Sequence, residues 1–317
     1  MQFQKSFFHK YCSIFFIPFG IIFGFTCSLK AQKASKKLEL YHCTGDFPTN
    51  TLAYLKKAGM PKVPIFDNRY IDPEGDMRIN ADLLKKTVLE EIPNARDTGL
   101  AILDWESDAF TTLYTAKASS DSFKLVFKEY LKALTLCQKL RPKMKWGFYH
   151  IPITDYWLND TLAWQQANKN LLPLLRQSDV LYPSMYNHYP DTTTHTHNSY
   201  YIDYNIRQSL KLGAALKKKV VVFVWHRYHE GNTRDGLRLI PEAEFYASLK
   251  RMIDFKIDNK RIDGLMWFAG DAFYLNIKPS LLPIENPLKK SIAVHYDDIV
   301  KKYFLLFQRL KKYYSNL

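Results

Sequence analysis

The sequence predicts an α/β protein that folds as a distorted TIM-like (β/α) barrel of about seven to eight parallel strands. Short β-rich runs alternate with amphipathic helical stretches, which is typical of consecutive βα units. The run Val220–Val224 is apolar on both faces, as expected for a parallel strand that is covered on both sides. A doubly wound open sheet is the alternative, but the sequence lacks the Gly-rich phosphate loop that such sheets often carry.

Strands and helices are expected in alternation along the whole chain. The strands are expected at residues 38–43, 62–67, 99–104, 145–151, 179–186, 219–225 and 263–268. The helices are expected at residues 48–58, 81–91, 121–140, 160–177, 199–217, 241–257 and 293–313. The segment 121–140 shows the helical pattern best, because Phe123, Phe127 and Leu134 recur at helical spacing while lysines lie opposite.

Residues 1–31 have the pattern of an export signal. A basic start is followed by the short apolar run Ile14–Phe25, and Ala31 offers a small-residue cleavage point. The apolar run is too short to be expected as a membrane-spanning helix. Lipid attachment at Cys27 is the alternative form of processing. Residues 32–317 contain no linker-like segment, so we expect them to form a single secreted domain without a membrane span.

Composition and net charge narrow the class of molecule that the protein is expected to bind. Hydrophobic residues make up 47% and charged residues 24% of the chain, a balance typical of globular proteins. The net charge is +14, and removal of residues 1–31, which hold three lysines and no acidic residue, lowers it to +11. A positive field favours the capture of polyanions such as nucleic acid, anionic lipid or acidic polysaccharide. Nucleic acid is not expected as a partner, because no recognised binding motif accompanies the charge.

The triplet Asp104-Trp105-Glu106 is the candidate catalytic centre. It lies at the C-terminal end of the predicted strand 99–104, directly after the apolar run Gly99–Leu103, and active sites of this barrel class lie at the C-terminal ends of the strands. Residues two apart on a strand point to the same side, so both carboxylates should face one place while Trp105 packs on the other side. Two acids in a partly dry cleft do not both ionise freely, so one pKa is expected to rise, as a general acid requires.

Aromatic residues close the later strands. The fifth strand ends in Tyr186, the sixth closes with Trp225–His229, which includes Tyr228, and the seventh closes with Met266–Phe268, which includes Trp267. The rings and hydroxyls at these strand ends could form a sugar-binding subsite. His195 and His197 have a spacing that can hold zinc, but no third ligand accompanies them, so a polar loop is expected there. We expect no metal and no cofactor. Outside residues 1–31 only two cysteines remain, which is no disulfide framework, and Cys137 lies on an apolar helical stripe.

Five segments together resemble the hyaluronidase family of glycoside hydrolases, of the bee-venom and mammalian types. They occur in the family's order and span most of the chain after the export signal. The segments are 97–106 (DTGLAILDWE), 140–149 (LRPKMKWGFY), 181–186 (LYPSMY), 223–228 (FVWHRY) and 264–267 (GLMW).

The resemblance implies a mechanism and residue roles. Glu106 would protonate the leaving oxygen, and the substrate's own 2-acetamido oxygen would attack the anomeric carbon in place of an enzyme nucleophile. Asp104 would orient the acetamido group. Tyr186 and Tyr228 would hold the reacting sugar, and Trp267 would form a wall of the subsite. The implied activity is endo-hydrolysis, with retention, of β-N-acetylhexosaminide linkages in a glycosaminoglycan such as hyaluronan or chondroitin, by a monomeric enzyme.

The sequence departs from the family and leaves two alternatives open. Cys43 and Cys137 do not lie where the family's two disulfides would need them, and no Cys-rich C-terminal module follows. A chitinase-like enzyme is one alternative, although Ile102 occupies a position where that family's motif carries an aspartate. The other alternative is a secreted, non-catalytic carbohydrate-binding barrel.

Overall fold

The computed structural model describes residues 37–315 except 44–48, 158–160, 270 and 272–286. Residues Lys36–Leu317 form one compact unit. The predicted export signal and Cys27 lie outside the described residues and stay predictions. No helix among the described residues is long and apolar enough to cross a membrane.

Each ladder between the strands that the structure describes is parallel, which confirms the predicted α/β class. One sheet has the order β1-β7-β6-β5 and the other has the order β2-β3-β4. The strands are β1 (Glu39–His42), β2 (Ile65–Asp67), β3 (Gly99–Asp104), β4 (Met144–Phe148), β5 (Val180–Leu181), β6 (Lys219–Val224) and β7 (Gly264–Trp267). Each lies within one residue of, or inside, a predicted strand.

Single bridges connect the two sheets at both edges. At one edge His42 is bridged to Lys62, which precedes β2, and at the other Tyr149, which follows β4, is bridged to Tyr182. The seven strands therefore follow one another in chain order around a ring, although the continuous ladders within the described residues do not close it. Gly147 permits the close approach of β4 and β5, because a Cβ there would clash with the carbonyl oxygen of Val180.

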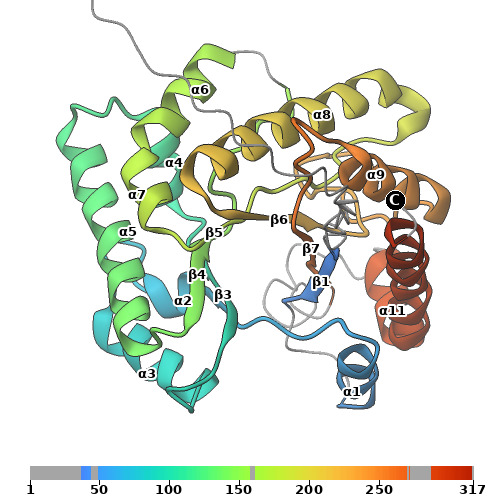
Figure 1. Cartoon of the computed structure of the whole chain (residues 1–317), viewed down its shortest axis with the longest axis horizontal. Coiled ribbons are helices and arrows are strands. Elements are labelled where there is room, and N and C mark those ends of the chain that lie inside the picture. Colours follow the sequence, from blue (N-terminus) through green and yellow to red (C-terminus); the bar gives the residue numbers. More distant parts are fainter. Residues whose placement is uncertain (1–36, 44–48, 158–160, 270, 272–286, 316–317) are drawn as a thin grey trace, which may run out of the picture. The chain divides into compact units, whose positions relative to one another are not determined.

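Helices surround the strands (Figure 1), with α3, α5 and α7 near β3 and β4, and α9 and α11 near β7 and β1. Their bounds are α1 (Thr49–Lys57), α2 (Asn68–Ile71), α3 (Ala81–Glu91), α4 (Asp108–Thr115), α5 (Asp121–Leu140), α6 (Thr161–Asn170), α7 (Leu172–Gln177), α8 (Asp191–Leu216), α9 (Glu242–Asp254) and α11 (Pro287–Tyr314). The predicted bounds of α3 and α5 are confirmed to the residue. Asn80 and Ser120 cap these two helices by accepting hydrogen bonds from backbone N–H groups of the first turn.

Two sequence predictions about the helices were wrong, and two short helices were missed. The segment 160–177 is two helices, α6 and α7, because Pro173 lies in the first turn of α7 and cannot continue an earlier helix. The polar loop expected around His195 and His197 is instead the beginning of α8, which follows Pro190. Two short helices, α2 and α4, were not predicted; their N-terminal caps are the side chains of Asp67 and Ser107.

The period of two along each strand divides the core into two clusters. Residues on one side pack against the helices, and we call this group the outer cluster; in β3 and β6 it includes Ala101, Leu103, Val222 and Val224. Residues on the other side face the space within the ring and form the inner cluster. This set contains Cys43, Leu100, Ile102, Tyr149, Tyr182, Tyr186, Val221, Phe223, Trp225 and Met266.

Candidate active site

The end of β3 carries the two predicted acids. Side chains alternate between the two sides of β3, and Ile102 belongs to the inner cluster. The same alternation directs Asp104 and Glu106 to the inner side and Trp105 into the outer cluster. Trp105 is buried, and its ring stacks on that of Tyr130 from α5 at a centroid distance of 4.6 Å. The predicted packing role of Trp105 is therefore confirmed.

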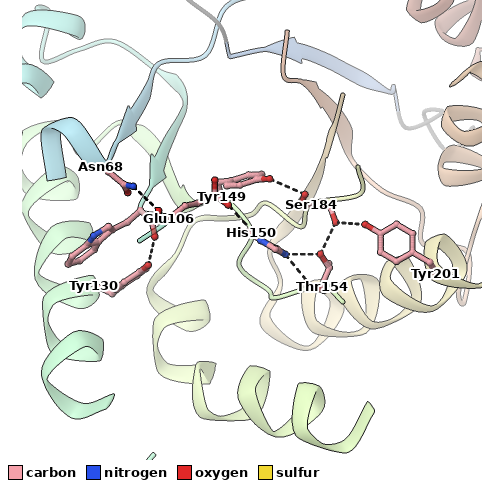
Figure 2. Close-up of polar contacts among 9 residues, drawn as sticks. Asn68, Glu106, Tyr130, Tyr149, His150, Thr154, Ser184 and Tyr201 are labelled. Carbon is pink, nitrogen blue, oxygen red and sulfur yellow. Dashed lines mark hydrogen bonds and ion pairs between the residues drawn. The ribbon is translucent and has the colours of Figure 1, made fainter. Parts of the chain in front are cut away.

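Two hydrogen bonds hold the backbone of this triplet (Figure 2). The Tyr130 hydroxyl donates to the carbonyl oxygen of Trp105 at 2.6 Å, and the Asn68 amide Nδ2 donates to the carbonyl oxygen of Glu106 at 2.7 Å. Ser107 then caps α4 by accepting a hydrogen bond from the backbone N–H of Ala109. The backbone around Glu106 is thus held by hydrogen bonds from α5 and α2. After Glu106 it is held by the capped first turn of α4.

Both carboxylates lie close to the same tyrosine. Burial raises the pKa of Tyr149 well above its usual value, and the charges of Glu106 and Asp104 raise it further. Burial likewise raises the pKa of Tyr186, with Tyr149 and Glu106 among the smaller causes. The Glu106 side chain is 49% exposed, whereas both tyrosines are buried. A substrate can therefore reach Glu106 beside two phenols that keep their protons.

Aromatic rings surround Tyr186 on several sides. Its ring stacks with Phe268, which follows β7, at a centroid distance of 6.1 Å, and lies 5.7 Å from Trp225, which follows β6. Tyr149 and His229 lie 6.0 Å and 6.2 Å away. The predicted site residue Tyr186 therefore shares the inner cluster with the residues near the two acids.

Tyr228 and Trp267, the other two predicted substrate contacts, do not join Tyr186 in the inner cluster beside the two acids. The Tyr228 hydroxyl donates to Glu244 on α9 at 2.9 Å, and the residue packs in the outer cluster. Trp267 is fully buried in the same cluster, where its Nε1 donates to His226 at 3.1 Å and its ring lies 5.3 Å from Phe307 on α11.

The physical reason for the position of Trp267 is the side-chain alternation of the strands. Met266 and Phe268 belong to the inner cluster or pack against it, so the intervening Trp267 must point outward. Trp225 belongs to the inner cluster directly after β6. Tyr228 lies beyond the strand, where this alternation no longer applies, and its hydrogen bond to Glu244 holds it in the outer cluster. Trp225 and Phe268, which the sequence also places at these two strand ends, were not among the predicted site residues.

His150 is another residue beside the acids that the sequence analysis missed. Its Nδ1 lies 4.0 Å from Oε1 of Glu106, and its Nε2 lies 3.0 Å from the hydroxyl oxygen of Thr154 (Figure 2). Its ring stacks on Phe110 of α4 at 5.0 Å. Burial, together with the nearby His229, lowers the pKa of His150 to about 4, although a backbone hydrogen bond with Thr154 opposes the shift. The signal was its position at the end of the predicted strand 145–151.

The remaining histidines and cysteines do not form a metal group among the described residues, in which no set of three His, Cys, Asp or Glu side chains could hold an ion. His188 stacks on His229 at 4.5 Å, and burial lowers the pKa of His188 to about 3. His197 contacts the carbonyl oxygen of Tyr156 at 2.8 Å through Nε2. Cys137 is a buried free thiol, as predicted.

Comparisons with known proteins agree with one another. A family model described as hyaluronidase matches residues 107–239, beginning directly after Glu106. Hyaluronidase Tab y 2.0101 of Tabanus yao is 24% identical over 308 residues, covering 83% of this chain and 81% of that protein. A hyaluronidase of Apis mellifera is 23% identical over 182 residues, covering 54% of this chain and 43% of its own length.

Solved structures of bee venom hyaluronidase have a similar fold. One crystal form has a TM-score of 0.54 at 16% identity and covers 84% of this chain and 100% of that one. The complex of that enzyme with a hyaluronic acid tetramer has a TM-score of 0.53 at 17% identity, covering 81% of this chain and 100% of that one. At these identities the likeness supports the arrangement of strands and helices as a TIM-barrel-like fold.

Proposed function

We propose that this chain is a glycosidase of the hyaluronidase type, which its similarity to hyaluronidases supports, and that it cleaves β-N-acetylhexosaminide linkages within a glycosaminoglycan such as hyaluronan or chondroitin. One observation carries the proposal. Asp104 ends β3 and Glu106 follows two residues later on the same side, and a half-exposed Glu106 lies beside the buried phenols of Tyr149 and Tyr186. A reachable acid next to a second carboxylate and aromatic rings is suited to proton transfer at a sugar linkage.

The proposed reaction has two steps and retains the configuration at the anomeric carbon. In the first, Glu106 donates its proton to the glycosidic oxygen while the substrate's acetamido carbonyl oxygen attacks the anomeric carbon, and the bond to the leaving sugar breaks. Asp104 accepts the acetamido N–H and stabilises the positive charge that develops there. In the second step, the Glu106 carboxylate takes a proton from water, whose oxygen attacks the anomeric carbon and opens the cyclic intermediate.

Aromatic contacts are assigned according to the side that each residue faces. Tyr186 and Phe268 are the proposed contacts for the reacting sugar, because they pack together beside the acids and Phe268 is only partly buried. Tyr228 and Trp267, the residues first expected in this role, have a packing role in the outer cluster in this proposal. Trp225, which follows β6, packs against Tyr186.

The polymer and the location of the enzyme are part of the proposal. A bee venom hyaluronidase has been crystallised with a hyaluronic acid tetramer, which supports a polysaccharide substrate of that type here. The net positive charge favours a polyanion. The export-like pattern of residues 1–31 supports secretion, and we propose that the secreted enzyme acts as a monomer.

The test is digestion of several polymers combined with a single substitution. Purified protein is incubated with hyaluronan, chondroitin and chitin oligomers at acid and neutral pH, and product lengths and anomeric configuration are measured. Glu106→Gln should lower kcat by at least about 10²-fold while binding of the polymer stays near that of the parent, because the amide cannot donate the proton. Glu90→Gln, an exposed change on α3, is the matched control and should leave kcat unchanged.

The outcomes distinguish the proposed enzyme from a chitinase-like enzyme and from a non-catalytic carbohydrate-binding protein. Cleavage of chitin oligomers alone would favour the chitinase-like alternative. If all three polymers bind but remain intact, the carbohydrate-binding alternative replaces the enzyme. Full activity of Glu106→Gln would show that the proton donor is assigned to the wrong residue.

A further inference from the structure

His150 occupies a position from which it acts on Glu106 without contacting the scissile bond. It lies two residues after β4, with a backbone φ of 59° that turns its side chain toward the end of β3. Its Nδ1 faces Oε1 of Glu106 across 4.0 Å (Figure 2). Since the side chain of Glu106 is half exposed, a movement of about 1 Å would bring the two atoms within hydrogen-bond distance, and such contacts often tighten only when substrate binds.

The hydrogen bonds of Thr154 determine which nitrogen of His150 carries the proton. The Thr154 hydroxyl donates its single proton to the carbonyl oxygen of Ser184 at 2.8 Å. It can therefore only accept from Nε2 of His150, which lies 3.0 Å away, and the Thr154 carbonyl oxygen at 3.3 Å from Nε2 is also an acceptor. Nε2 must carry the proton, so Nδ1 of the neutral ring presents a lone pair to Glu106.

We propose that His150 is a positioning residue that accepts a hydrogen bond from the protonated form of Glu106 and so keeps the catalytic proton on that carboxyl group. The proposal rests on the proposed function, in which Glu106 is the acid. A lone pair facing a carboxylate repels the ionised form, and a hydrogen bond from the neutral form favours it, so both effects raise the pKa of Glu106.

The charges around His150 and Glu106 agree with a raised pKa of Glu106. Burial lowers the pKa of His150 to about 4, so the ring is neutral at higher pH, and the neighbouring His188 and His229 also have lowered pKa values. Among the described residues, the groups close to Glu106 besides His150 include the carboxylate of Asp104 and three phenols. These phenols belong to Tyr130 from α5, Tyr149 after β4 and Tyr186 after β5.

The opposite arrangement is an ion pair between His150 as a cation and Glu106 as an anion. It would lower the pKa of Glu106 and make the group a poor acid. The two arrangements predict opposite signs when the ring nitrogen is removed, and this makes the proposal testable.

The first experiment is the pH dependence of kcat/KM for two substitutions. His150→Phe keeps a ring that can stack on Phe110 but removes the lone pair, so the basic limb of the profile should move to lower pH by about one unit. His150→Asn retains an acceptor near the position of Nδ1 and tolerates the positive φ, so it should restore most of that shift. His197→Asn on α8 is the control and should leave the profile unchanged.

The second experiment reads the carboxyl group directly and needs no turnover. Carbon-13 spectra of glutamate-labelled protein, with the Glu106 signal assigned by Glu106→Gln, give the pKa of Glu106 in the parent and in His150→Phe. Nitrogen-15 spectra of histidine-labelled protein report the protonated nitrogen of His150. A lower pKa of Glu106 in His150→Phe, together with a neutral His150 protonated at Nε2, supports the proposal even if no tested polymer is cleaved.

Three results would overturn the proposal. One is a basic limb or a Glu106 pKa that stays in place or moves to higher values in His150→Phe. Another is an equal shift in His150→Asn and His150→Phe, since the lone pair would then have no role. The third is a doubly protonated His150 at the pH of activity.

Discussion

The hydrogen bond from Tyr130 to the backbone between the two acids allows a quantitative test of how the site is held. Tyr130→Phe removes only the hydroxyl. The ring would keep its stack on Trp105 at 4.6 Å and its contact with Phe148 at 4.7 Å, so no large cavity is created. Burial and the nearby acids raise the pKa of Tyr130 well above its usual value, so the hydroxyl is a donor at every working pH.

The expected magnitude follows from the buried carbonyl group that loses this donor. Removing one partner of a buried hydrogen bond costs about 1–3 kcal/mol, so the free energy of unfolding should fall by that amount. Because the carbonyl belongs to Trp105, between Asp104 and Glu106, the two carboxylates should also lose their alignment. Displacements of this kind cost about 10-fold to 100-fold in rate, and we expect the loss in kcat rather than in KM.

Tyr303→Phe is the matched control for this substitution. Tyr303 on α11 is also buried, and its hydroxyl also donates to a backbone carbonyl oxygen, that of Ile240. It should lose similar stability in urea unfolding and keep its kcat. If Tyr130→Phe also keeps its kcat while losing stability, the hydrogen bond stabilises the fold without aligning the acids, and the reasoning is refuted.

Three further outcomes are expected. Burial lowers the folded-state pKa values of His150 and His188 to about 4 and about 3, so below the unfolded value near 6.5 the unfolded chain binds protons that the folded chain does not. The free energy of unfolding should therefore fall by roughly 1–2 kcal/mol per histidine between pH 6.5 and pH 5. The fall should be smaller in His188→Phe, which lacks one of the two histidines. Asp271→Asn leaves the buried guanidinium of Arg227, now 2.8 Å from Asp271, without its counter-charge, and should cost about 3–5 kcal/mol in urea unfolding; a cost under about 1 kcal/mol would contradict the pairing. Added salt should slow cleavage of a polyanion at low substrate concentration, and salt-independent kcat/KM would make the net positive charge irrelevant to capture.

Short-range sequence patterns were sufficient to predict most of the strands and helices. The apolar run of β6 and the helical spacing of α3 and α5 are short-range signals, and each element formed at or within its predicted bounds. The Asp-x-Glu pair could be found in the same way, since it directly follows an apolar run and two residues of a strand share a side. The break between α6 and α7 also had a local signal, Pro173, which the sequence interpretation overlooked.

Tertiary structure decided which strand-end residues meet. Trp267 and Tyr228 lie at the correct ends of their strands, but the inward side of a strand is defined only relative to the ring, and both residues pack outward. His150 and Glu106 are far apart in sequence and meet because β3 and β4 are parallel neighbours whose ends coincide. The proton position on His150 depends on the Thr154 hydroxyl, which is committed to the carbonyl oxygen of Ser184, 30 residues further along the chain. Residue type and period are local properties, whereas these proximities arise only when the strands pair.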